Sequence, residues 1–319
     1  MKLRHASFCL ALVALTGCPT PTPTDDTSTP LVDAPAGLRC PRMGVPNPDE
    51  LTLPCCYRVS QEANTAAPEL RLAFIDITEP ATSPLASSTV GDLLNTTMRE
   101  ETFQWLFRGE GGESDGPITI TTGFGRRDAA AGTYAFSTGA PPDMTAWAPV
   151  TLNGTLTGET ITTDPYEGTL TVPIFDEAMT TVQIELQLHA VRVVTSTFTE
   201  NRSCIGTLET ATRYAPGATL GGFIRIDEAR EGMLMFPGIE ASLCGVVAGN
   251  LTDATYCTAT AQGDWDVPPD SQCNAAGVCF RNGMGGTCDP AMEDLLGAGG
   301  GCNAWYLEAT FAAHGVDIE

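Results

Sequence analysis

The chain is almost without lysine and has very little histidine. Lys2 is its only lysine, and it has three histidines in 319 residues. Sixteen Lys plus Arg stand against 39 Asp plus Glu, which gives a formal net charge of -23. Nucleic-acid phosphates and anionic lipid surfaces are bound through clustered Lys and Arg, so this composition excludes nucleic acid as a partner and docking through a basic patch.

Sequence signatures of common active sites are missing as well. The chain contains no HExxH, no P-loop and no CxxC, and His189 and His314 lie far apart, which argues against zinc and thioredoxin-like sites. One GxSxG string, residues 112–116, lies in an acidic, Gly-rich segment that we interpret as a hairpin loop, because a nucleophile elbow needs a strand before it and a helix after it. We interpret His189 as a histidine on the polar face of a strand, not as the base of a Ser-His-Asp triad, and we assign no catalytic residue.

The N-terminus has the pattern of an export signal. A basic start at residues 1–5 precedes a mostly apolar run over residues 6–15. About ten such residues are too few to span a bilayer, which needs about 20, and suit the core of a signal peptide. No later stretch is apolar for long enough to predict a transmembrane helix.

The apolar run ends in Leu15-Thr16-Gly17-Cys18, which resembles the lipobox of bacterial lipoproteins. The resemblance implies that residues 1–17 are removed and that Cys18 becomes the acylated N-terminus. Two acyl chains anchor a protein stably, so the product would be tethered to a membrane without spanning it. We expect a lipid-anchored protein of the bacterial cell envelope, at the outer membrane or cell surface. An ordinary secretory signal that happens to contain a cysteine is the alternative.

Proline and threonine alternate directly after Cys18. Residues 18–37 therefore predict an extended, polyproline-like tether of about 3.1 Å per residue. We interpret residues 38–319 as a disulfide-stabilised β domain. Residues 240–319 are either an elaboration of that domain or a small cysteine-rich subdomain.

Period-2 alternation of apolar and polar residues dominates the folded region. It is clearest in Thr169–Ile174 and in Val182–Leu188, and its phase slips at Ala190-Val191, which predicts a bulge or a change of sheet. Residues 305–312 alternate too and predict a terminal strand that rejoins the sheet. The expected fold is mainly β: an antiparallel β-sandwich or jelly-roll-like domain with a few short helices and a disulfide-rich C-terminal elaboration.

Helices are expected at three places. They cover residues 89–99 and 227–235, and a third begins at Asp289, where Asp followed by Pro is a good helix start.

Ten cysteines remain after Cys9 leaves with the signal and Cys18 is acylated. An even number in an oxidising compartment predicts disulfides, with a connectivity that spacing alone does not fix. The candidates are Cys40, Cys55, Cys56, Cys204, Cys244, Cys257, Cys273, Cys279, Cys288 and Cys302.

One acidic segment is a candidate cation site. Asp264, Asp266 and Asp270 could offer oxygen ligands to Ca²⁺, although the segment lacks the glycine and glutamate positions of an EF-hand; a solvated acidic turn is the alternative. We expect no other cofactor.

Tryptophans and paired carboxylates are the remaining candidate features. Trp147 and Trp265 lie in loop-like surroundings and could stack on a sugar, whereas Trp105 and Trp305 lie in alternating runs typical of a core. Two carboxyls facing one bond are the machinery of glycoside hydrolysis. The adjacent acidic pairs are Glu100-Glu101, Asp176-Glu177 and Asp227-Glu228.

The favoured function is a lipid-anchored extracytoplasmic protein with a non-catalytic binding or structural role. Two alternatives stay open: a carbohydrate-active enzyme that uses paired carboxylates, and a periplasmic assembly subunit that binds protein partners. The membrane is the expected partner through the lipid anchor, while a glycan or protein partner is left unidentified.

Overall fold

The computed structural model describes residues 65–128, 130–139, 145–175, 182–199, 202–210, 213–236, 239–249, 265–274, 276–283, 288 and 301–319. The predicted signal (1–17), the tether (18–37) and the helix expected from Asp289 lie outside these residues. So do six residues of the predicted sites, namely Cys18, Cys40, Cys55, Cys56, Cys257 and Asp264.

Strands make up most of the described chain, so the predicted mainly β class is confirmed. The strands are β1 (Glu69–Glu79), β2 (Trp105–Glu110), β3 (Gly116–Arg127), β4 (Tyr134–Phe136), β5 (Val150–Thr157), β6 (Thr160–Thr163), β7 (Thr169–Phe175), β8 (Val182–Thr195), β9 (Cys204–Ile205), β10 (Thr207–Thr210), β11 (Arg213–Ala215), β12 (Ala218–Arg225), β13 (Met233–Phe236), β14 (Ile239–Ser242), β15 (Ser271–Cys273), β16 (Cys279–Arg281) and β17 (Ala304–Gly315). The helices are the short 3₁₀ turn η1 (Pro84–Ala86) and α1 (Ser88–Arg99), α2 (Ile226–Glu231) and α3 (Leu243–Ala248).

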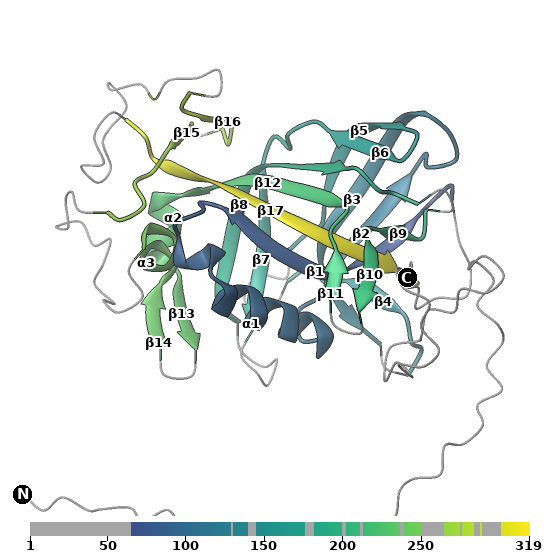
Figure 1. Ribbon diagram of the computed structural model, residues 1–319, viewed down its shortest axis with the longest axis horizontal. Helices are drawn as coiled ribbons and strands as arrows, with labels where there is room; N and C mark the ends of the chain where they lie inside the picture. Colours follow the sequence, from purple (N-terminus) through teal and green to yellow (C-terminus); the bar gives the residue numbers. More distant parts are fainter. Residues whose placement is uncertain are drawn as a thin grey trace, which may run out of the picture. The chain divides into compact units, whose positions relative to one another are not determined.

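The main sheet closes on itself as an antiparallel barrel. Its strands follow the order β1-β2-β3-β5-β6-β8-β12-β17, and β17 also pairs with β1. In Figure 1 β17 runs through the middle of the molecule beside β12. The expected sandwich or jelly roll is not confirmed, because a sandwich keeps two separate sheets whereas here the terminal strand joins the two edges of one sheet.

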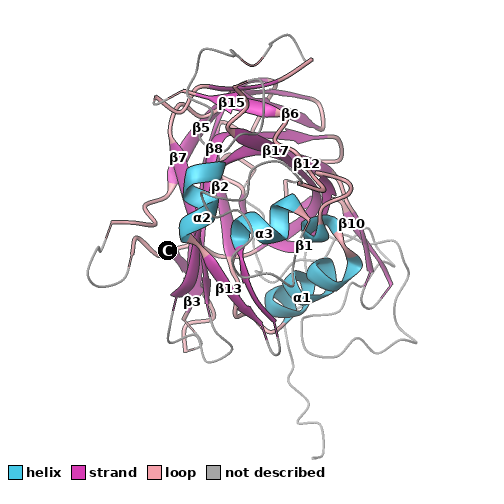
Figure 2. Ribbon diagram, turned by 90° about the vertical axis from the view of Figure 1, so that its left-hand side faces the viewer, coloured by secondary structure: helices cyan, strands magenta, loops and turns pink. Residues whose placement is uncertain are grey.

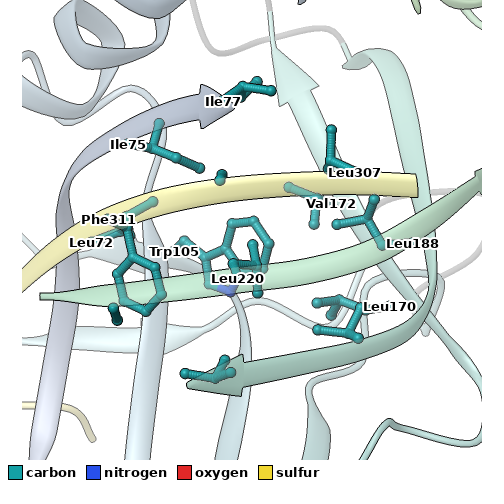
Figure 3. Close-up of a cluster of buried hydrophobic side chains, with 14 of the residues drawn as sticks. Leu72, Ile75, Ile77, Trp105, Leu170, Val172, Leu188, Leu220, Leu307 and Phe311 are labelled. Atoms are coloured by element: carbon teal, nitrogen blue, oxygen red, sulfur yellow. The ribbon is translucent and has the colours of Figure 1, made fainter. Parts of the chain in front are cut away.

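Alternating apolar residues fill the barrel. In β5, Val150, Leu152 and Leu156 are buried, while Thr151 and Asn153 between them are exposed. Equivalent residues of the other strands meet them in one hydrophobic core, part of which is drawn in Figure 3. Labelled there are Leu72, Ile75, Ile77, Trp105, Leu170, Val172, Leu188, Leu220, Leu307 and Phe311.

The predicted slip in β8 is a β-bulge. The register with β12 shifts between Gly221, opposite Arg192, and Phe223, opposite His189, and Ala190 takes a left-handed φ of 47°. The bulge lets Leu188 and Val191 both join the core although they are three residues apart, and it leaves His189 on the outer face.

Helix α1 lies against the outside of β1, and its bounds confirm the helix expected over residues 89–99. The Asn95 amide accepts a hydrogen bond from the Ile75 N–H (3.0 Å) and donates one to the Ile75 carbonyl (2.8 Å). Those two contacts satisfy backbone groups of a strand edge that would otherwise need another strand.

Helix α2 is shorter than the helix expected over residues 227–235. It ends at Glu231, and β13 begins at Met233. Figure 2 shows α2 and α3 near one another and α1 further along. None of the helices in the described segments is both long enough and apolar enough to cross a membrane.

Disulfide bonds, which the cysteine content predicts, are confirmed. One bridge joins Cys273 to Cys279 across the β15–β16 hairpin, and another joins Cys288 to Cys302 just before β17. Cys204 and Cys244 are disulfide-bonded as well.

Candidate functional site

The most chemically suggestive group of side chains surrounds His189. This residue lies in β8 next to the bulge and is only 3% exposed. His189 lies on the outer face of its strand, as its polar-face position predicts, but other parts of the chain cover it and keep it from solvent.

Two different groups contact the two nitrogens of the His189 ring. Nε2 lies 2.7 Å and 2.9 Å from the two carboxylate oxygens of Glu228, which belongs to α2. Nδ1 lies 3.2 Å from the hydroxyl oxygen of Thr169, the first residue of β7 and the direct cross-strand neighbour of His189. Hydroxyl, imidazole and carboxylate thus form a continuous hydrogen-bonded row.

The carboxylate determines which ring nitrogen carries the proton when the imidazole is neutral. An ionised carboxylate only accepts hydrogen bonds, so the Nε2–H faces Glu228. Nδ1 is then an acceptor, and the Thr169 O–H donates to it. This tautomer is the one in which the imidazole can take a proton from the hydroxyl.

A disulfide-bonded hairpin covers the ring. A Cβ added at Gly277, in the turn between β15 and β16, would lie 3.6 Å from His189 Nδ1. The turn is held by the Asn274 side chain, which accepts hydrogen bonds from the N–H groups of Ala276 (2.9 Å) and Val278 (3.1 Å). The Cys273–Cys279 bridge closes its base, so the cover over His189 is covalently fixed.

The carboxylate end of the row carries further charge. Arg225 Nε lies 4.0 Å from Glu228 Oε1 and donates to Asp227 Oδ1 at 3.0 Å. The hydrogen bond that Arg225 donates to Asp227 raises the pKa of Arg225. One guanidinium therefore faces two carboxylates, and Arg230 of the same helix interacts electrostatically with Asp227 as well.

The second described histidine, His314, has a different environment. It lies in β17 directly opposite Arg71 of β1, whose Nε donates to His314 Nε2 at 3.3 Å. Burial, and then the charge of Arg71, lower the pKa of His314 well below 6.5. This imidazole is held as a neutral hydrogen-bond acceptor.

Arg71 itself is buried, with 2% of its surface exposed. Its Nη1 donates to Gln104 Oε1 (2.9 Å) and to the Met98 carbonyl (3.3 Å). Glu101 Oε1 lies 3.7 Å away and accepts a hydrogen bond from the Tyr134 hydroxyl at 3.1 Å. Burial raises the pKa of Tyr134, so its phenol stays protonated in this network.

Of the three predicted calcium ligands, Asp270 has its carboxylate engaged by other groups of the protein. Asp270 accepts hydrogen bonds from Arg281 Nε (2.6 Å), the Ser271 hydroxyl (2.8 Å) and the Tyr306 N–H (2.9 Å). Asp266 is exposed, and Asp264 lies outside the described residues. Within the described ranges no group of three or more His, Cys, Asp or Glu side chains could hold a metal ion.

The two tryptophans predicted to stack on sugars are engaged elsewhere. Trp147 is 1% exposed and donates its indole N–H to Glu185 Oε1 at 2.8 Å, so its exposed position was predicted wrongly. Trp265 stacks on Trp305 with 5.2 Å between ring centres. Trp105 and Trp305 are buried, as their alternating runs predict.

Three members of the acidic pairs have cationic or imidazole partners. Glu101 binds Arg127 at 2.6 Å, Asp227 binds Arg225, and Glu228 binds His189 and lies 4.0 Å from Arg225. Asp176-Glu177 lies outside the described residues. The GxSxG string forms the turn between β2 and β3, which confirms the hairpin interpretation.

Barrel residues line a small apolar cavity. Its volume is about 20 Å³, close to the minimum that holds one water molecule. The walls are almost wholly apolar, so the space does not offer a water its usual polar partners. The lining residues are Pro68, Leu70, Phe107, Gly109, Ile118, Ile120, Ile161, Val193, Thr195, Phe198 and Ile205.

No protein-family model, curated protein or solved structure matches this chain. The site therefore has to be interpreted from its own residues. The sequence pattern places Thr169 in a strand but not in a site, and it identifies Glu228 only as half of an acidic pair. Aligning the two predicted strands in the register of β7 and β8 would have paired Thr169 with His189. No local sequence pattern predicts that α2 lies beside this pair.

Proposed function

We propose that the protein is a lipid-anchored protein of the bacterial envelope that holds a disulfide-stabilised β-barrel off the membrane for a binding or structural role. The lipobox-like Leu15-Thr16-Gly17-Cys18 and the Pro-Thr tether support the anchoring. The disulfides support an oxidising, extracytoplasmic compartment, because such bonds are rare in the reducing cytosol.

One structural observation favours a role carried by the outer surface. Among the described residues, apolar side chains pack the barrel interior, and the small cavity between them has a volume of about 20 Å³, room for about one water molecule. Barrels that store or transport small ligands keep a much larger space. A glycan or protein partner would accordingly meet the outside of this barrel.

Anchoring is tested by changing the predicted acylation site. We expect the wild-type chain to incorporate radiolabelled palmitate and to remain with membranes until detergent is added. Cys18→Ala should abolish both properties, and globomycin should leave the wild-type chain as an unprocessed precursor. Cys9→Ala is the matched control, since Cys9 lies in the removed signal. A Cys18→Ala product that is still labelled and membrane-bound would contradict the proposal.

A further inference from the structure

We propose that Thr169 is a nucleophile, that His189 is its general base, and that this site cleaves small neutral esters at the outer face of the barrel. The inference goes beyond the proposed envelope role and does not depend on the anchor. It replaces the sequence-based expectation that the chain has no catalytic residue.

The geometry carries the assignment. Thr169 Oγ1 lies 3.2 Å from His189 Nδ1, at the outer limit of the range for a hydroxyl and its base. His189 Nε2 lies 2.7 Å from Glu228 Oε2. The three residues come from β7, β8 and α2, so the fold brings together groups that are up to about 60 positions apart along the chain.

Each group is in the state that its role requires. The Thr169 residue is exposed, so a substrate carbonyl can reach the hydroxyl. The His189 ring is 3% exposed, so bulk water does not compete for Nδ1. Glu228 is the positioning residue: it holds the Nε2–H and stabilises the imidazolium that forms during the reaction.

The site is also rigid. Thr169 and His189 are a registered cross-strand pair, and the bulge at Ala190 fixes the outward direction of the ring. The turn of the Cys273–Cys279 hairpin packs against the Nδ1 end of the ring, next to Gly168. Fixed positions matter because a base that must first be oriented contributes little to the rate.

Charge and access limit the substrate class. Glu167, two positions before Thr169, is exposed and places a negative charge beside the hydroxyl, which disfavours an anionic substrate. The hydroxyl lies on a strand surface, which suits a short acyl group. An ester fits better than an amide, because an alkoxide leaves more readily than an amine and needs less assistance.

The reaction has two balanced stages. Thr169 Oγ attacks the carbonyl carbon while its proton passes to His189 Nδ1; the bond to the alcohol oxygen then breaks, and the departing alcohol takes that proton. Water attacks the resulting acyl-threonine, gives one proton to Nδ1, and releases the carboxylic acid as the proton returns to Thr169 Oγ. Ester and water are the only reactants, and nothing is oxidised or reduced.

The test uses the full processed chain with its disulfides intact and p-nitrophenyl acetate as the probe. We expect hydrolysis above the buffer rate and an acetyl group on Thr169 in quenched samples analysed by mass spectrometry. Thr169→Ala should lower the rate at least about 100-fold, the lower end of what a positioned acid or base contributes. Thr171→Ala, two positions along the same strand, is the control and should keep the wild-type rate.

Further variants separate the base from the positioning residue. His189→Gln should reduce the rate as strongly as Thr169→Ala, and Thr169→Ser should retain activity. Glu228→Gln should lower kcat and leave KM unchanged, and Glu228→Asp should restore part of kcat, which a purely structural role would not do.

Two results would overturn the proposal. One is a wild-type rate equal to that of buffer; the other is hydrolysis that survives in Thr169→Ala. Because Thr169 is exposed, its alanine variant should fold, and an unchanged melting temperature would show that any loss is chemical. Acetylation of another residue would also count against Thr169.

Discussion

His189 and His314 are equally hidden but lie in opposite electrostatic surroundings. Both point outward from the barrel wall, with 3% and 1% of their surfaces exposed. The first has a carboxylate at Nε2 and a hydroxyl at Nδ1. The second has the guanidinium of Arg71 at Nε2.

The neighbours distinguish the two imidazoles. Burial first, and then the adjacent cation, lower the pKa of His314, which serves as a neutral acceptor that helps to hold a buried arginine. The carboxylate beside His189 accepts a hydrogen bond from its Nε2, so Nδ1 is the nitrogen that faces the Thr169 hydroxyl. Burial alone would not distinguish a structural histidine from a base.

Removing the cation beside His314 should have the largest effect on stability. Arg71→Ala leaves Gln104, the Met98 carbonyl and Glu101 without their shared partner, and we expect a loss of about 3–5 kcal/mol in the free energy of unfolding. Arg127→Ala is the matched control: Arg127 binds the same Glu101 but is 38% exposed, so its loss should be within about 1 kcal/mol. Urea denaturation measures both. Equal losses would mean that Arg71 is no more important than a surface cation.

Removing the anion beside His189 should have a smaller effect. Glu228→Ala leaves the Nε2–H of His189 without its acceptor, which should cost about 1–3 kcal/mol. The neighbouring Asp227→Ala removes an ion pair with Arg225. The Asp227 side chain is 40% exposed, so the free energy of unfolding should change by no more than about 1 kcal/mol. Thermal unfolding of the two variants compares two carboxylates of the same helix, whose side chains are 21% exposed in Glu228 and 40% exposed in Asp227. A larger effect for Asp227 would contradict this ranking.

The smallest effect is the pH dependence that His314 contributes. Its pKa is lowered in the folded state, so below pH 6.5 the unfolded chain binds a proton that the folded chain does not. The contribution of His314 to the free energy of unfolding is therefore fully present above pH 6.5, and it declines as the pH falls toward the folded-state pKa. His314→Gln should flatten the decline in melting temperature between about pH 8 and about pH 5. An unchanged slope would show that other groups cause it.

Local pattern was enough to predict part of this fold. Alternation in Thr169–Ile174 and Val182–Leu188 identified β7 and β8, and the broken phase at Ala190-Val191 located the bulge. Helix α1 was predicted within a residue at its start. These features depend on neighbours only a few positions away, which a sequence displays directly.

Features that depend on distant pairing could not be predicted. The same alternation suits a sandwich and a barrel, and only the pairing of β17 with β1 distinguishes them. His189 has a polar-face position by pattern, but its burial requires the Gly277 turn, which lies far along the chain. Trp147 was treated as a candidate for sugar stacking for the same reason. Its loop-like sequence does not reveal that residues of β3 and β8 pack against it.

The closure of the barrel also affects the order in which its strands can pair during folding. Arg71 of β1 and His314 of β17 are 243 positions apart, yet they lie side by side in the finished sheet. A chain that emerges from its N-terminus presents β1 early, with an unpaired edge that invites wrong partners until residues 304–315 arrive. Long-range pairing of this kind slows folding. Asn95 of α1, only 20 positions after Ile75, can occupy part of the other side of that strand much sooner.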